Sequence, residues 1–143
     1  MKKLSPLRLL AAAVVATLAL TGCGSSAAIQ DAAIEKALAD ASAEINKTCP
    51  MEIDSDTRLD NTSTAPGKIL QYNYTLTKYA KADLTADQVT QIQDLMKPAV
   101  VNELKSNAAM KALKDYQVTF KYNFKSSDGQ DLFEFAIAPA DYA

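Results

Sequence analysis

The chain has 143 residues, no histidine, two cysteines and a formal net charge of −2 at pH 7. The absence of histidine removes the commonest general base and metal ligand, and with it every catalytic triad that depends on imidazole. A weakly acidic chain without a basic cluster also argues against a nucleic-acid partner. We therefore expect a protein that is not an enzyme and that binds neither a cofactor nor nucleic acid.

Residues 1–22 have the pattern of a signal peptide. Lys2, Lys3 and Arg8 precede an apolar run over residues 9–20. In a helix this run would span about 18 Å, which is short of the roughly 30 Å hydrocarbon core of a bilayer. The pattern therefore favours export over a membrane-spanning helix.

The apolar run ends in Leu20-Thr21-Gly22-Cys23, which resembles the lipobox of bacterial lipoproteins. In those proteins the cysteine is acylated and the chain is cut just before it, so Cys23 would become a lipidated N-terminus. Ordinary signal cleavage nearby is the alternative. Cleavage before Cys23 removes 22 of 143 residues and three of 15 basic side chains, leaving 121 residues with 12 basic and 17 acidic side chains, a charge of −5. Membrane attachment would then come from the acyl chains.

Residues 23–28 predict a short lipidated tether, followed by a single domain over residues 29–143. Gly24 after the acylated cysteine, in place of aspartate, would favour the outer membrane, facing the periplasm, under the sorting rule of enterobacterial lipoproteins. With Cys23 acylated, Cys49 has no partner for an internal disulfide. We expect Cys49 to be a small buried hydrophobe; the alternatives are an intermolecular disulfide or a reactive thiol.

The first half of the domain predicts a helix followed by two strands. Apolar residues recur at three- and four-residue steps over residues 28–47, as in an amphipathic helix, and Pro50 follows its end. The next segment reads as extended chain with a turn at residues 65–68, which predicts one strand that starts at Leu59 and a second over residues 69–78. The alternation places one set of side chains in the core: Leu70, Tyr72, Tyr74 and Leu76.

The second half predicts a long helix and a hairpin. Residues 85–88 fit a capping box, and the helix that follows contains Pro98, which favours a kink or break. A short helical piece over residues 107–115 precedes strands over residues 116–125 and 132–138. The sequence thus predicts an α+β fold of order α-β-β-α-β-β. In it, a four-stranded antiparallel sheet of two hairpins carries the N-terminal helix and a kinked central helix on one face.

Two groups of residues are candidate binding sites. Asp56, Arg58 and Asp60 share one face if the segment is a strand, so the acids can hold the arginine in place, or the arginine can be exposed as a protein-binding hot spot. Tyr72 and Tyr74 alternate with leucines, which favours the core, although the two rings could also form a ligand platform.

The acidic cluster around Arg58 admits two further interpretations. Asp54, Asp56 and Asp60 could hold calcium, but the glycine and terminal glutamate of an EF-hand loop are missing, so we favour turn and capping roles and predict no metal site. Asp54 and Asp56 could also form the carboxylate pair of a glycosidase, which would need a cleft and two different pKa values.

The segment Cys49 to Asp60 reads C-P-M-E-I-D-S-D-T-R-L-D and, with Y-N-Y-T-L and D-Y-Q-V-T-F-K-Y-N-F further along, resembles a family of small uncharacterised bacterial envelope proteins. That family has no established activity, so the resemblance implies one compact domain and no catalytic residue. In architecture alone the chain is similar to pilotins, acylated proteins that escort secretin subunits to the outer membrane.

These observations predict a membrane-anchored lipoprotein that binds or helps to assemble another envelope protein. The alternative is a periplasmic module for a small ligand or a carbohydrate, in which Tyr72, Tyr74, Tyr122 and Phe124 would line a groove.

Overall fold

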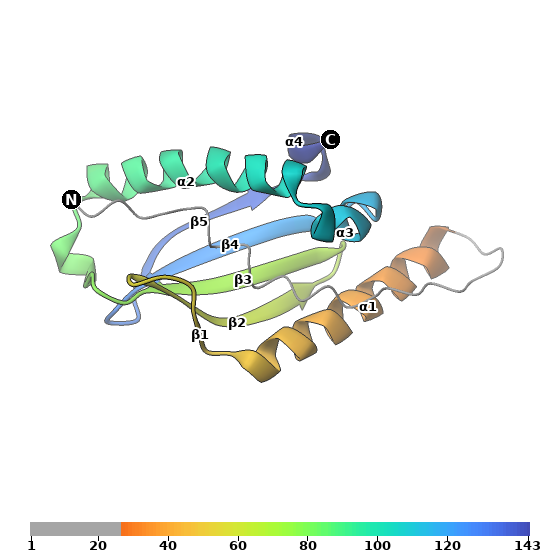
Figure 1. The fold of residues 1–143 in the computed structure, drawn as a ribbon, viewed down its shortest axis with the longest axis horizontal. Coiled ribbons are helices and arrows are strands. Elements are labelled where there is room, and N and C mark those ends of the chain that lie inside the picture. The colour runs from red at the N-terminus through yellow and green to blue at the C-terminus, as the bar shows by residue number, and fades with distance from the viewer. Residues whose placement is uncertain (1–26) are drawn as a thin grey trace.

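The computed structural model describes residues 27–143 (Figure 1). The predicted signal peptide, Cys23 and most of the predicted tether lie outside these residues. The main elements are α1 (Ala27–Thr48), β1 (Met51–Glu52), β2 (Thr57–Ala65), β3 (Ile69–Leu76), α2 (Ala86–Ser106), α3 (Lys111–Asp115), β4 (Thr119–Ser126), β5 (Asp131–Ile137) and α4 (Pro139–Tyr142). Within the described residues, none of the helices combines the length and apolar character that a membrane span requires.

The sheet differs from the predicted one in strand number and direction. It has five strands in the order β1-β2-β3-β4-β5, and β3 and β4 run parallel while the other neighbours are antiparallel. The prediction of four antiparallel strands was therefore wrong. Strand β1 has only two residues, which is too short to show an alternation in the sequence. The two hairpins join through β3 and β4 because the chain between them crosses back over the sheet.

Helix α2 makes that crossover. It begins at the predicted capping box, in which the Gln88 amide donates to Thr85 Oγ1 at 3.2 Å and the Thr85 amide donates to Gln88 Oε1 at 2.9 Å. It then continues through Pro98 as one helix, so the expected break is absent. Pro98 and Asp94 are both exposed, and water can reach the Asp94 carbonyl that the proline leaves without its amide partner.

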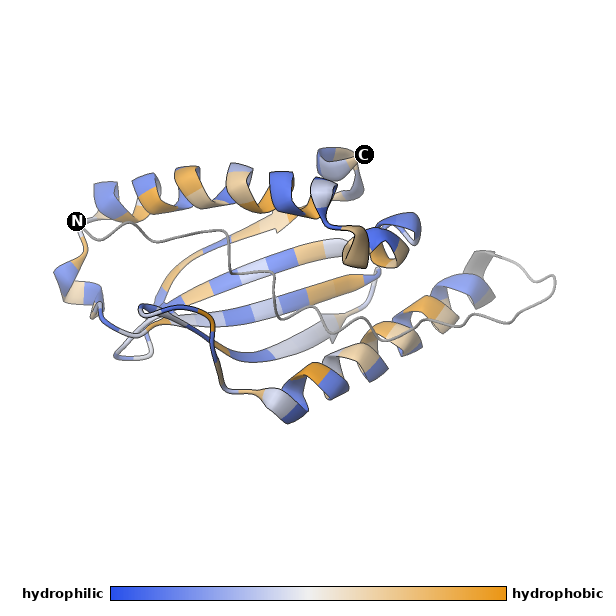
Figure 2. Ribbon diagram, in the orientation of Figure 1, coloured by the Kyte–Doolittle hydropathy of each residue, from blue (hydrophilic) through white to orange (hydrophobic). Residues whose placement is uncertain are grey.

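Both long helices pack on one face of the sheet (Figure 1). Helix α1 lies along β2 and β3, and α2 lies along β5, so the central β3–β4 pair is flanked by the two helices. The strands alternate in hydropathy (Figure 2), and their apolar face forms one core with the buried stripes of α1 and α2. The side chains that α1 and α2 contribute to it are Ile34, Leu38, Ile45, Met96, Val100 and Leu104.

The opposite face of the sheet carries polar side chains that bond to one another. The side-chain amide of Gln71 donates to Asn73 Oδ1 at 2.7 Å, and the side-chain amide of Asn73 donates to Asn61 Oδ1 at 2.8 Å. Lys121 pairs with Glu134 at 3.2 Å on the same face. This face has no aromatic platform in β3 or β4, because the rings of both strands point to the helices.

Side-chain amides close both edges of the sheet. Next to the short β1, the Asn46 side chain accepts a hydrogen bond from the Thr62 amide at 2.6 Å and donates to the Thr62 carbonyl at 2.9 Å, as a neighbouring strand would. At the other edge, the Gln93 side chain on α2 donates to the Glu134 carbonyl at 3.3 Å. Unpaired strand edges invite pairing with another chain, so these contacts protect the sheet from strand addition.

We predict that Asn46→Ala lowers the free energy of unfolding by about 1–3 kcal/mol, because the Thr62 backbone loses two hydrogen bonds in a partly buried position. Urea unfolding measures the loss. Asn102→Ala, at an exposed position on α2, is the matched control and should change stability little. Equal losses in the two variants would contradict the proposed role of Asn46.

Candidate functional site

Six aromatic rings form a continuous layer on the helix-covered face of β3, β4 and β5. The strand register places them in two cross-strand rows, Tyr72–Tyr122–Phe135 and Tyr74–Phe124–Phe133. Neighbouring rings within the rows have centroids 4.7–5.4 Å apart, and their planes differ by 11–22°. The rings stack because strand register and alternation align them, and each stacked pair adds to the stability that burial supplies.

The tyrosines of this layer are core residues, as their alternation with leucines predicted. Tyr72 is 1% exposed, and Tyr74 and Tyr122 are 0% exposed. The rings therefore do not present an open platform for a sugar, which weakens the interpretation of this layer as a carbohydrate groove. The three hydroxyl groups nevertheless bring polar atoms into the core that the helices cover.

Glu103 of α2 adds a carboxylate to these hydroxyls. It occurs between the buried Val100 and Leu104, at the border of the apolar stripe, and is itself half-buried. Burial raises the pKa of its carboxyl. Burial is also the main reason why the pKa values of Tyr74 and Tyr122 lie well above the ordinary value; Tyr72 raises both further, and Glu103 contributes least. The rings of Tyr72, Tyr74 and Tyr122 stack on one another, and we call these three side chains together with Glu103 the tyrosine–glutamate cluster.

Two polar atoms of this cluster are buried without a hydrogen-bond partner: the Tyr122 hydroxyl and Glu103 Oε2. Within residues 27–143 they are the only buried side-chain nitrogen or oxygen atoms in that state. One of them is a hydroxyl that can donate, and the other is a carboxylate oxygen that accepts. Sequence patterns drew attention to Tyr72 and Tyr74 but missed Glu103, whose signal is a single acid at the edge of a helical apolar stripe.

The second group of sequence candidates lies at the start of β2. Arg58 Nε donates to Asp60 Oδ1 at 2.7 Å, and the Thr75 hydroxyl donates to the other oxygen of Asp60. Asp56 is 3% exposed and forms an ion pair with Lys78 at 2.6 Å. The Asp54 side chain accepts from the Asp56 amide at 2.8 Å, a turn contact. These contacts favour a role of the acids in holding the entry to β2.

The structure also bears on Cys49 and on the interpretation of the three acids as a metal site. Cys49 is half-buried at the edge of the core, and burial together with the charge of Asp60 raises the pKa of its thiol, which disfavours the reactive thiolate. Among residues 27–143, no three carboxylate or cysteine side chains come together in a way that could hold a metal ion. Asp54, Asp56 and Asp60 are therefore not gathered into one coordination site.

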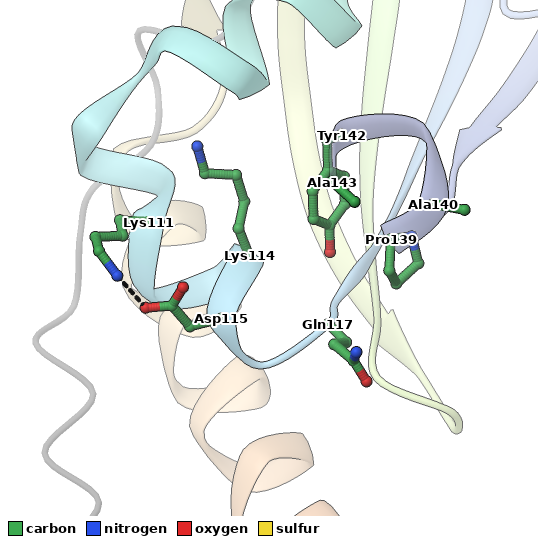
Figure 3. A pocket seen from close by; sticks show the side chains of 8 residues that line it. All are labelled: Lys111, Lys114, Asp115, Gln117, Pro139, Ala140, Tyr142 and Ala143. Atoms are coloured by element: carbon green, nitrogen blue, oxygen red, sulfur yellow. Dashed lines mark hydrogen bonds and ion pairs between the residues drawn. The ribbon is translucent and has the colours of Figure 1, made fainter.

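A separate cavity of about 500 Å³ lies between α3 and α4 (Figure 3). It is lined by Lys111, Lys114, Asp115, Gln117, Pro139, Ala140, Tyr142 and Ala143. Lys111 pairs with Asp115 at 2.5 Å, and Lys114 donates to the Lys105 carbonyl at 3.1 Å. The Tyr142 hydroxyl donates to the Val118 carbonyl at 2.7 Å. The polar groups of this cavity already serve the fold, so it is a weaker candidate than the tyrosine–glutamate cluster.

Comparison with known families shows the family to which the chain belongs. The profile of a domain of unknown function, DUF8479, matches residues 32–133, which include α2, β2, β3, β4 and most of α1. The chain belongs to the DUF8479 family. Searching the curated proteins yields no match.

Solved structures share the fold of this DUF8479 member at low sequence identity. PA3611, an inferred secreted protein of Pseudomonas aeruginosa, has a TM-score of 0.66 and 16% identity, covering 84% of this chain and all of its own. The pilotin EpsS of the Vibrio vulnificus type 2 secretion system has a TM-score of 0.63 and 13% identity, covering 81% of this chain and 97% of its own. The type II secretion pilotin AspS of Vibrio cholerae has a TM-score of 0.57 and 14% identity, covering 80% and 96%. At these identities the likeness shows the fold.

We predict that the DUF8479 member loses stability steeply in alkaline solution. Burial raises the pKa of Tyr142 to about 12 and raises those of Tyr72, Tyr74 and Tyr122 as well, whereas tyrosines of the unfolded chain ionise near about pH 10. The unfolded state therefore releases these protons first, so their contribution is complete below about pH 10 and is lost as the pH rises through the raised values. Tyrosinate absorbance and far-ultraviolet circular dichroism should change together. Ionisation of these four side chains with native secondary structure retained would contradict the prediction.

Proposed function

We propose that the protein is a lipid-anchored factor of the bacterial envelope that acts by binding another envelope protein. The observation that carries this proposal is the fold that the chain shares with two type 2 secretion pilotins over nearly their whole length. The lipobox ending at Cys23 supports anchoring, and Gly24 supports the periplasmic side of the outer membrane. The chain would act as an escort or assembly factor and would carry out no chemistry of its own.

What the fold leaves available supports one place for the partner. Strand addition is disfavoured, because Asn46 and Gln93 close the two sheet edges. On the polar face of the sheet, side chains form hydrogen bonds and an ion pair with one another. The half-buried Glu103 of α2 carries one of the two buried polar atoms that have no hydrogen-bond partner among the described residues. We place the partner there.

The alternative is a module that binds a small ligand. It would use the cavity between α3 and α4, since the rings of Tyr72, Tyr74, Tyr122 and Phe124 are buried. Lys111 and Asp115 of that cavity pair with each other, and Lys114 and Tyr142 donate to backbone carbonyls, so these groups already have partners within the fold. A protein partner remains the better supported function.

Site-specific photo-crosslinking in living cells tests the proposal. A photoreactive amino acid replaces Ala99, one helical turn before Glu103 on the same side of α2, and in a control chain it replaces Gln130 in the exposed β4–β5 turn. We expect one discrete protein adduct from position 99 and none from position 130. Absence of an adduct at position 99, with the chain correctly anchored, would overturn the proposed function.

Lipidation is tested in the same cells with Cys23→Ala. If acyl chains hold the protein at the membrane, this variant should lose membrane association in fractionation, and its adduct from position 99 should weaken because the local concentration falls. Full retention of the variant in the membrane fraction would remove the lipid anchor from the proposal while leaving the partner to be judged by crosslinking.

A further inference from the structure

One end of the sheet gathers the β2–β3 turn, the start of β4 and the end of β5. The first turns of α1 lie at the same end, because Asp31 pairs with Lys68 of that turn at 3.3 Å. Helices α3 and α4 lie there too, since α3 leads into β4, α4 follows β5, and the Tyr142 hydroxyl donates to the Val118 carbonyl at 2.7 Å. We call this part of the domain the α3–α4 end (Figure 1).

A lipid anchor on Cys23 would hold the α3–α4 end next to the membrane. Four residue steps separate Cys23 from Ala27, where α1 begins, and they span at most about 14 Å. Strands β3 and β4 have eight residues each and put the opposite end of the sheet about 26 Å further away. The tether is therefore too short for the domain to stand on its opposite end.

The two ends of the domain differ in charge. The opposite end carries seven acidic and three basic side chains, a net charge of −4, whereas the α3–α4 end carries four of each sign and is neutral. The segments counted are residues 51–56, 77–87 and 125–131 at the opposite end, and residues 27–35, 65–69, 105–118 and 138–143 at the α3–α4 end. An anionic lipid surface repels the acidic end and does not repel the neutral one.

Two lysines of the α3–α4 end are available to bind phosphate. Four lysines of the described residues form no ion pair, and Lys105 and Lys114 are the two that lie at this end. Lys114 donates to the Lys105 carbonyl at 3.1 Å, which uses one of the three protons of its ammonium group. These two cations therefore lie on the part of the domain that the tether keeps nearest to the membrane.

We propose that the α3–α4 end lies on the phospholipid surface, with the ammonium groups of Lys105 and Lys114 against headgroup phosphates and the acidic end pointing away from the membrane. This inference rests on the lipid anchor of the proposed function and adds an orientation to it. Acyl chains alone hold the protein at the membrane but leave the domain free to turn about its tether. Contacts between lysine and phosphate fix one orientation, in which the partner meets the domain.

Fluorescence quenching on vesicles tests the orientation. The acylated protein is reconstituted into vesicles of phosphatidylethanolamine and phosphatidylglycerol, some of whose headgroups carry a nitroxide quencher. A fluorescent amino acid replaces Ala108, which is exposed between α2 and α3, or, in a control chain, Gln130 in the β4–β5 turn. We expect quenching at position 108 and none at position 130. Quenching at position 130 that equals or exceeds that at position 108, or no quenching at either, would overturn the inference.

A double variant tests the two lysines. Lys105→Gln with Lys114→Gln should lower the ratio of docked to free domains about 25-fold, about fivefold for each cation lost near an anionic surface, and so weaken quenching at position 108. Lys81→Gln with Lys97→Gln is the matched control, because these exposed lysines also form no ion pair and lie away from the α3–α4 end. Circular dichroism checks that both variants are folded. Undiminished quenching in the first variant, or an equal loss in both, would contradict the role of the two lysines.

The outcomes distinguish this inference from the proposed function. If position 99 gives its protein adduct while position 108 is not quenched, the partner stands and only the orientation fails. If Cys23→Ala leaves the chain in the membrane fraction, the lipid anchor fails and the orientation fails with it. If position 108 is quenched but position 99 gives no adduct, the orientation stands and the proposed partner fails.

Discussion

The parallel alignment of β3 and β4 is the constraint on which the rest of the structure depends. Only this register sets Tyr72 beside Tyr122 and Tyr74 beside Phe124, and so continues the aromatic rows to β5. A slip by one residue would turn Asn73 and Asn123 toward the helices in place of the rings. Parallel neighbours also require the chain to return to the same end of the sheet, and α2 makes that return. The helix that carries Glu103 is therefore a topological necessity before it is part of a site.

Closing the sheet edges with side chains has a consequence for how the protein meets others. A short edge strand and two side-chain amides block pairing through the backbone, which is a low-specificity route to association in a crowded envelope. Recognition of another protein then depends on side chains, and a few of them can determine its specificity. Asn46 links α1 to β2 and Gln93 links α2 to β5, so the contacts that close the edges also fix the positions of the two helices that flank the ring layer.

Local patterns in the sequence predicted much of the fold. The predicted helix over residues 28–47 agrees with α1 within a residue at each end, the capping box at Thr85 forms as expected, and the alternation in β3 assigned the correct face to the core. The misses are non-local. Parallel pairing depends on where a crossover helix places two distant strands, and β1 is defined only by its neighbour β2. Likewise, no sequence pattern shows that a buried glutamate oxygen lacks a partner.

The ring layer shows why the hydroxyl at Tyr122 calls for an explanation beyond packing. Three of its six positions, 124, 133 and 135, are phenylalanines that are also buried and stacked, so a hydroxyl is not required for the layer to form. A buried unpaired hydroxyl or carboxylate oxygen costs about 1–3 kcal/mol, a sizeable share of the roughly 5–15 kcal/mol by which a domain is stable. A chain that only had to fold would gain by replacing Tyr122 with phenylalanine and Glu103 with an apolar residue. That the sequence carries both polar groups is consistent with a role for them beyond packing the core.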